Sequence, residues 1–246
     1  MVVGCILAGG VGRRVGAQEP KQFYKVFGKP IIVYTMERFN NCPDVDIFDV
    51  VCVTSYIDEV NKLAEHYNIN KLRKVIEGGS SFGESLRNGV YAFEDYCDVD
   101  DVFMMHMAVA PLVPDDVISD LVRVCMKHGN AFSAEPSYKC MCEKTGDFFS
   151  DKYLDRELIY GLNTPQAIRY GKILDLYKQA ERDLYDLNTH THMSTLLLDM
   201  NERLYFSMSS PLNIKITTME DVELFEAYIF MKEEKAKRGN IYVDQT

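Results

Sequence analysis

Glycines and basic residues gather near the N-terminus in a pattern that suits an anionic ligand. A short apolar run from Val2 to Leu7 has the composition of a buried strand. Four glycines and three basic side chains follow it: Gly9, Gly10, Gly12, Gly16, Arg13, Arg14 and Lys21. Glycine lets backbone N–H groups approach a ligand closely, and guanidinium and ammonium groups pair with phosphate oxygens. The segment predicts a polyphosphate-binding loop; its plainer alternative is a glycine-rich turn with surface arginines.

The charge distribution favours a small anion over a nucleic acid. The 246-residue chain carries a formal net charge of −10, which argues against general nucleic-acid binding. The first 38 residues nevertheless hold six basic and two acidic side chains. A local positive field within an acidic protein suits a small anionic ligand.

Cysteine usage and hydropathy predict a cytoplasmic protein without a membrane segment. Seven cysteines, an odd number, lie mostly in apolar segments, which is typical of reduced thiols. Cys140 and Cys142 form a C-x-C pair without a second pair, so a zinc site is not favoured. No apolar run approaches the roughly 18 residues of a membrane helix, and the N-terminus lacks the pattern of a signal peptide.

Apolar runs alternate with helical periodicity along the first half of the chain. After the first strand, further strands are predicted at 49–54, 74–77, 101–106 and 131–134. Helices are predicted at 30–39, 55–67 and 81–93 and from about 114, with Ser55-x-x-Asp58 and Ser81-x-x-Glu84 as N-terminal caps. The alternation predicts an α/β fold with a doubly wound, mostly parallel sheet that binds ligands at the carboxyl ends of its strands.

The second half is less regular. Residues 136–156 are polar and predict a protruding arm within a single domain of residues 1–246. Helices are predicted at 172–180 and 193–200, and strands at 204–208 and 213–216. Thr218-x-x-Asp221 predicts the cap of a last helix that ends near 237, followed by a loose tail at 238–246.

A dinucleotide-binding fold is the obvious rival for the first loop. Its fingerprint needs a third glycine in register and an acidic residue at the end of the second strand. Val15 stands at the third position, and the second predicted strand ends in Thr54 and Ser55. The sequence therefore disfavours this alternative.

Several motifs occur in the order found in one enzyme family. They are L-A-G-G-x-G-R-R-x-G from Leu7, P-K-Q-F from Pro20, G-G-S-S-F-G-E-S-L-R-N-G from Gly78, L-D-R from Leu154, T-P-Q from Thr164 and N-I-K-I-T-T from Asn213. In these motifs the chain resembles the cytidylyltransferases that activate methylerythritol phosphate or ribitol phosphate. A-G-G with P-K-Q-F looks more like the ribitol branch.

The resemblance implies a Rossmann-like nucleotidyltransferase fold with a dimerisation arm, and a homodimer. It also implies attack of a polyol phosphate on CTP to give a CDP-polyol and pyrophosphate, in isoprenoid or in teichoic-acid and cell-surface polysaccharide biosynthesis. The family's catalytic cations match Arg14, Lys21 and Lys215. Its nucleotide-binding positions match Leu7, Ala8, Gly9, Gly10, Gly12, Gly78, Gly79 and Ser85. Its positions for the polyol phosphate match Arg156, which typically reaches a neighbouring subunit, and Thr164, while Lys139 is a candidate replacement for a lost cation.

Some family positions carry other residues here. Met107 replaces the aspartate that helps to bind Mg²⁺, while Ala110 and Phe82 replace arginines. Methionine is no ligand for a hard cation, so no protein residue is assigned to a metal, and Mg²⁺ is expected chiefly on the nucleotide phosphates. Two hypotheses stay open: an active enzyme, or an impaired paralogue that binds nucleotide or acts as an interaction protein. For His106, both a ligand contact and a buried core position are open.

Overall fold

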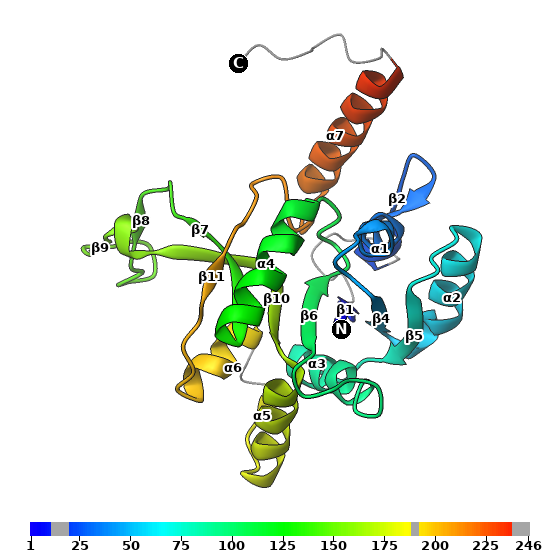
Figure 1. The fold of residues 1–246 in the computed structure, drawn as a ribbon. Coiled ribbons are helices and arrows are strands. Elements are labelled where there is room, and N and C mark those ends of the chain that lie inside the picture. The colour runs from blue at the N-terminus through cyan, green and yellow to red at the C-terminus, as the bar shows by residue number, and fades with distance from the viewer. Residues whose placement is uncertain (11–19, 188–191, 238–246) are drawn as a thin grey trace.

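A seven-stranded sheet forms the centre of the molecule (Figure 1). The computed structural model describes residues 1–10, 20–187 and 192–237. The strand order is β11-β7-β10-β6-β1-β4-β5. The bounds are β1 Val2–Ala8, β4 Ile47–Cys52, β5 Leu72–Glu77, β6 Val102–Met107, β7 Asn130–Pro136, β10 Tyr160–Arg169 and β11 Phe206–Ser207. Strand β1 pairs in parallel with β4 and β6, β4 with β5, and β11 with β7, while β10 is antiparallel to both of its neighbours. The predicted, mostly parallel α/β sheet is confirmed.

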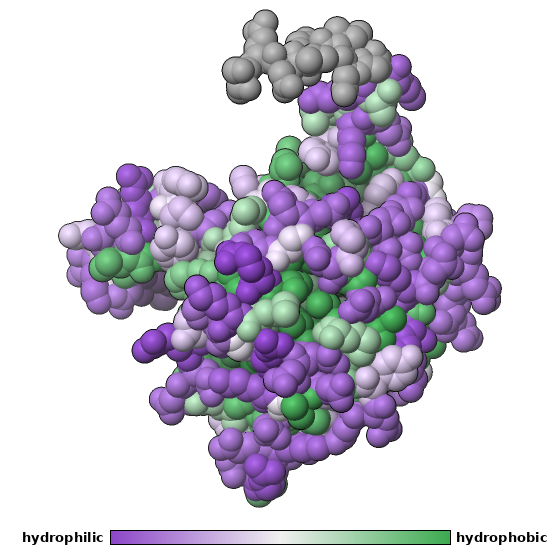
Figure 2. All heavy atoms as spheres, in the orientation of Figure 1, coloured by the Kyte–Doolittle hydropathy of each residue, from purple (hydrophilic) through white to green (hydrophobic). Residues whose placement is uncertain are grey.

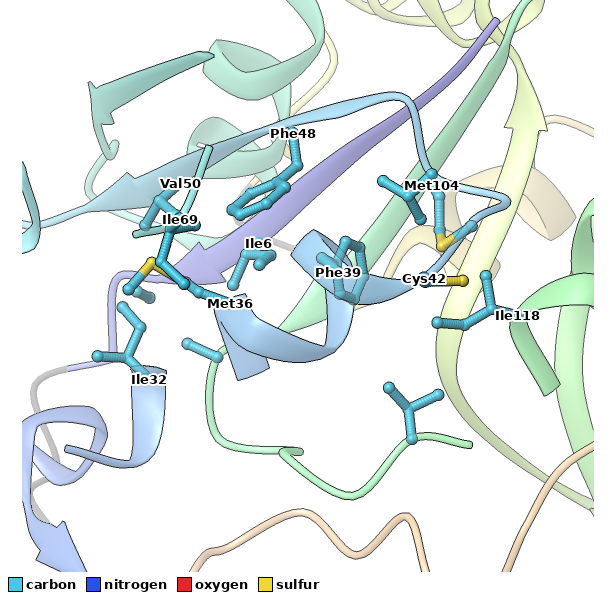
Figure 3. Packing of buried hydrophobic residues seen from close by; sticks show 14 of the residues in the cluster. Ile6, Ile32, Met36, Phe39, Cys42, Phe48, Val50, Ile69, Met104 and Ile118 are labelled. Carbon is cyan, nitrogen blue, oxygen red and sulfur yellow. The ribbon is translucent and has the colours of Figure 1, made fainter. Parts of the chain in front are cut away.

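Helices cover both faces of this sheet. One face packs against α1 Ile31–Asn41, α2 Ile57–His66 and α4 Asp115–His128, and the other against α3 Phe82–Tyr91, α5 Tyr170–Arg182 and α6 Met193–Asp199. Figure 3 shows the first core, where Ile6, Phe48 and Met104 of the sheet meet Met36 and Phe39 of α1. Alternate residues of β1 enter opposite cores, because successive side chains of a strand point to opposite faces.

The last helix packs on a third, smaller cluster. Helix α7 Met219–Lys237 buries Val222, Phe225 and Ile229 against Val26, Ile31 and Ile216. In Figure 1 its C-terminal half extends away from the sheet. None of the helices in the described part of the chain is long and apolar enough to cross a membrane.

Short elements fill the connections. The hairpins are β2 Lys25–Val26 with β3 Lys29–Pro30, and β8 Met141–Cys142 with β9 Tyr153–Leu154. The 3-10 turns are η1 Lys21–Phe23, η2 Thr54–Tyr56 and η3 Arg156–Leu158. Figure 1 shows the β8–β9 hairpin, between β7 and β10 in the chain, to one side of the sheet.

Several local predictions are confirmed and others are wrong. Ser81 caps α3 by accepting from the Glu84 N–H, and Thr218 lies within hydrogen-bond distance of the Asp221 N–H at the start of α7. Ser55 does not cap α2, which begins at Ile57 after the turn η2 and has no side-chain cap. The predicted strand at 213–216 is absent because those residues make no ladder, whereas β10 was not predicted. The predicted tail at 238–246 lies outside the described residues.

Candidate functional site

A hollow of about 510 Å³ lies at the carboxyl ends of β1 and β6. We call it the central hollow, and its lining comes from five segments of the chain: Leu7, Ala8, Gly9, Gly10, Lys21, Gln22, Gly79, Ser80, Ser81, Phe82, Ser85, Met107, Ala108, Val109, Lys215 and Thr217. Because the carboxyl ends of parallel strands meet at one edge of the sheet, residues far apart in sequence come together here. Most of the predicted nucleotide-binding residues, and Lys21 and Lys215 with them, face the same space.

The loop between β5 and α3 forms one wall. The Gly79 N–H donates to the Ser85 hydroxyl over 3.0 Å, and the Gly78 N–H donates to the Cys52 carbonyl over 2.8 Å. A Cβ atom on Gly79 would lie 2.2 Å from the Glu84 Cβ, so only glycine fits there. Gly78 belongs to the same loop but is not among the residues that line the hollow. The loop therefore holds the backbone against Ser85 at the first turn of a helix.

A reciprocal cap fixes the start of α3. The Glu84 carboxylate accepts from the Ser80 hydroxyl and N–H at 2.6 and 2.7 Å, while the Ser81 hydroxyl accepts from the Glu84 N–H at 3.2 Å. The bonds from Ser80 hold the pKa of Glu84 below its ordinary value. The Glu84 carboxylate is therefore occupied by hydrogen bonds within the loop, and its charge stabilises the N-terminus of α3.

Gln22 and Lys21 connect the opposite wall to its neighbours. The buried Gln22 amide donates to the Ala8 carbonyl over 2.6 Å, which ties the turn η1 to the end of β1. The Lys21 ammonium lies 3.3 and 3.4 Å from the carbonyls of Thr217 and Ile216. Gln22 was quoted within a motif but given no role. Its sequence neighbours, Lys21 and Phe23, give no pattern that marks a buried amide.

Two buried side chains, Thr35 and His106, hold the loop after β6 in place. The Thr35 hydroxyl donates to the Ala108 carbonyl over 2.8 Å, and His106 Nε2 lies 2.8 Å from the Ala110 carbonyl. His106 has no exposed surface, and burial lowers its pKa to about 4, although the bond to Ala110 favours the protonated form. The neutral ring donates from Nε2 and anchors the loop. Of the two open interpretations of His106, the structure therefore supports the core position.

His192 lies beside Phe82, which lines the central hollow. Its ring centroid is 6.1 Å from that of Phe82, and partial burial together with the charge of Lys215 lowers its pKa. The sequence indicated only a polar residue at a helix entry, and His192 does stand at the N-cap of α6. The neighbouring His190 lies outside the described residues.

The residues present do not fit a protein-held Mg²⁺. None of the described residues that line the central hollow is a carboxylate, and Met107 and Phe82 present apolar side chains there. Ala110 is completely buried. No group of three or more His, Cys, Asp or Glu side chains able to hold a metal occurs within 1–10, 20–187 and 192–237. Mg²⁺ ordinarily binds through one or two carboxylates together with substrate phosphates, and this lining offers it none.

Comparison with known proteins identifies the family. The model for 2-C-methyl-D-erythritol 4-phosphate cytidylyltransferase matches residues 2–231. The chain belongs to this family. A ribitol-5-phosphate cytidylyltransferase of Lacticaseibacillus paracasei is 36% identical over 95% of this chain and 100% of its own length. A 2-C-methyl-D-erythritol 4-phosphate cytidylyltransferase of Syntrophus aciditrophicus is 30% identical over 96% of this chain and 98% of its own length.

Solved structures of cytidylyltransferases share the fold. The 4-diphosphocytidyl-2C-methyl-D-erythritol synthase of Anaerococcus prevotii covers 93% of this chain, with 96% of its own chain matched, at a TM-score of 0.77 and 21% identity. The Francisella tularensis 2-C-methyl-D-erythritol 4-phosphate cytidylyltransferase covers 92%, with 98% of its own chain matched, at a TM-score of 0.75 and 26% identity. This protein is thus a nucleotidyltransferase of the cytidylyltransferase family.

The predicted acceptor residues of this cytidylyltransferase lie outside the central hollow. Arg156 and Lys139 belong to the segment around the β8–β9 hairpin, where Lys139 is exposed and Arg156 Nη1 lies 3.5 Å from the Tyr138 carbonyl. Thr164 is buried in β10, and its carbonyl accepts from the Asn213 amide. The described chain does not bring these three together with Lys21 and Lys215. Arg14 and Gly12 lie outside the described residues.

Proposed function

We propose that this cytidylyltransferase joins CTP to a polyol phosphate and releases pyrophosphate, with ribitol 5-phosphate as the acceptor. An oxygen of the acceptor phosphate attacks the α-phosphorus of CTP. The bond from the α-phosphorus to the oxygen bridging to the β-phosphate breaks, and its electron pair leaves with pyrophosphate. Because the acceptor phosphate is already anionic, the protein has mainly to align the two substrates and neutralise charge.

The observation that carries the proposal is the composition of the central hollow. Lys21 and Lys215 reach the same space as the glycine loop at Gly9 and Gly10, and the loop at Gly79 closes the other side. We assign the two lysines to the triphosphate, together with Arg14, which lies outside the described residues. The glycine backbone and Ser85 are assigned to the rest of the nucleotide.

The acceptor assignment rests on sequence similarity. Relatives at 36% and 32% identity are named ribitol-5-phosphate cytidylyltransferases, in Lacticaseibacillus paracasei and Vibrio parahaemolyticus. The methylerythritol-phosphate enzyme of Syntrophus aciditrophicus is 30% identical. We propose that Arg156, Lys139 and Thr164 contact the acceptor in a homodimer, with Arg156 reaching the central hollow of a second copy.

We place the reaction in the cytoplasm. All seven cysteines lie in the described residues and are free thiols, including the exposed Cys140 and Cys142. Exposed thiols suit a reducing compartment.

A pyrophosphate-release assay tests the function. With CTP, Mg²⁺ and ribitol 5-phosphate we expect turnover. With methylerythritol 4-phosphate as the acceptor we expect a rate at least about tenfold lower, which corresponds to about 1.4 kcal/mol of discrimination between the two acceptors. ATP, GTP and UTP in place of CTP are the matched controls.

The outcomes separate the hypotheses. CTP binding by calorimetry without turnover on any polyol phosphate would favour the impaired paralogue, which the family comparison does not favour. Absence of both CTP binding and turnover would rule out the enzyme and the nucleotide binder, and would leave an interaction protein with an inherited fold. Faster turnover with methylerythritol 4-phosphate would overturn the acceptor but not the reaction.

A further inference from the structure

The segment that carries Lys215 has no secondary structure to hold it. Residues 213–217 belong neither to the sheet nor to α7. An exposed lysine on such a segment would be loosely placed unless side chains fix the backbone on both sides of it. Asn213 and Ile216 are buried, while Lys215 between them is exposed. The contacts of these two neighbours therefore help to place the backbone of Lys215.

On the downstream side, Ile216 and the next residue are fixed at two places. The Ile216 N–H donates to the Val109 carbonyl over 2.8 Å, and its side chain is completely buried in the cluster beneath α7. The N–H and hydroxyl of Thr217 both donate to the Asp221 carboxylate at 2.7 Å. These contacts join the segment to the loop after β6 and to the start of α7.

On the upstream side, two side-chain amides anchor the segment, and that of Asn213 is buried. The Asn213 side chain is 1% exposed, and its Nδ2 donates to the Thr164 carbonyl in the middle of β10. The Asn163 amide donates back to the Asn213 carbonyl over 3.3 Å. Asn213 thus holds the segment to the strand that leads from the β8–β9 hairpin into the sheet.

We propose that Asn213 is a positioning residue that acts through Lys215, by tying the lysine's backbone to β10 at Thr164. The inference rests on the proposed function, in which Lys215 binds phosphate. It goes further than that function because it links β10, which carries the proposed acceptor residue Thr164, to Lys215, the proposed cation on the triphosphate. An error of about 1 Å in such a group costs on the order of 100-fold in rate, so a single buried amide is enough to matter.

The chain offers a matched control. Asn130 is 2% exposed, and its Nδ2 donates to the Arg203 carbonyl over 2.9 Å, so it also ties a strand to a distant segment. It lies at the start of β7, at the end of the sheet opposite to the central hollow. Asn213→Asp and Asn130→Asp each remove one buried amide donor at an almost unchanged side-chain size, and each adds one acidic group, so the two variants are also matched in the charge that they introduce.

The experiment is a double-mutant cycle with Lys215→Ala, read as kcat and KM for pyrophosphate release and as pyrophosphate affinity by calorimetry. We expect N213D to lower kcat/KM and pyrophosphate affinity roughly tenfold or more, and N130D to change either by less than about twofold while lowering the unfolding temperature. In the Lys215→Ala background, N213D should have almost no further effect, because the group it positions is gone.

Two results overturn the inference. One is the same fold-loss from N213D with and without Lys215; the other is equal functional losses from N213D and N130D, which would mark both as structural. If the wild type binds pyrophosphate but turns over no polyol phosphate, the proposed function fails while the affinity cycle still decides the role of Asn213. A wild type that binds no pyrophosphate overturns both.

Discussion

Individual side chains of the central hollow were foreseen unevenly. Residues inside recognisable motifs, such as Gly79 and Ser85, were predicted because their chemistry needs a particular residue type. Gln22 and His192 were not, since each acts through a tertiary contact that leaves no local pattern. Phe82 and Met107 were noticed as departures, and the structure adds that both face the hollow.

Met107 supports a test of the metal site. We expect Met107→Asp to place a hard oxygen ligand in the hollow beside the nucleotide phosphates. Mn²⁺ bound in the presence of CTP, followed by its electron paramagnetic resonance signal, should then bind roughly tenfold more tightly, while Met107→Leu should leave it unchanged. If both variants bind Mn²⁺ like the wild type, the metal does not approach this position.

His106 makes stability depend on pH. Its folded-state pKa of about 4 lies below the ordinary value of 6.5, so the unfolded chain binds the proton more tightly. The stability contributed by the neutral ring is therefore complete above pH 6.5 and is lost as the pH falls toward 4, by at most about 3 kcal/mol.

His106→Gln keeps a donor for the Ala110 carbonyl but does not titrate. Urea unfolding between pH 7 and pH 4 should show a shallower loss of free energy of unfolding for this variant than for the wild type. Parallel curves would mean that other groups dominate the acid response.

Helices and strands were predicted best from the sequence where the local sequence signal agrees with the tertiary contacts of the segment. Strands β1, β4 and β6 are apolar runs, and α3 and α7 have caps that the structure retains. Strand β10 was missed because Gly161, Asn163 and Pro165 read as turn residues. Asn163 and Pro165 are tolerated where the pairing of β10 with β7 shifts register between Leu162 and Gln166.

The segment at 213–216 shows the opposite error. Its alternating pattern predicted a strand, but its backbone N–H groups find separate partners, in Leu212 for Ile214 and in Val109 for Ile216. Alternation indicates which side chains a strand would bury if it formed. It does not record whether a neighbouring strand is available to pair with.

At the scale of the whole molecule, the β8–β9 hairpin exposes apolar side chains that one copy leaves uncovered. Tyr138, Phe149 and Tyr153 are 82%, 65% and 79% exposed, and Phe148 is fully exposed. Figure 2 shows hydrophobic surface on the lobe that projects at the left, where Figure 1 places β8 and β9. Apolar surface of this kind on a projecting element favours a protein partner, and the homodimer that we propose would supply one.

We expect sedimentation equilibrium to give twice the 28.2 kDa chain mass for the wild type. Replacing Phe149 and Tyr153 by serine should give a monomer that binds CTP and has lost most of its turnover, because the proposed acceptor residues come from the partner. Phe27→Ser, at a 56% exposed position in the β2–β3 turn, is the control and should stay dimeric and active. A fully active monomer would contradict the shared site.

The cationic lining of the central hollow has a consequence for how substrates arrive. Both proposed substrates are anions, and the protein as a whole repels them through its net charge of −10. At an ionic strength of about 0.15 M, charges are screened beyond roughly 8 Å, so the distant repulsion fades while Lys21 and Lys215 still attract an anion that has entered. Dilute buffer should therefore slow capture of the substrates, the reverse of the usual salt dependence of an electrostatically steered encounter.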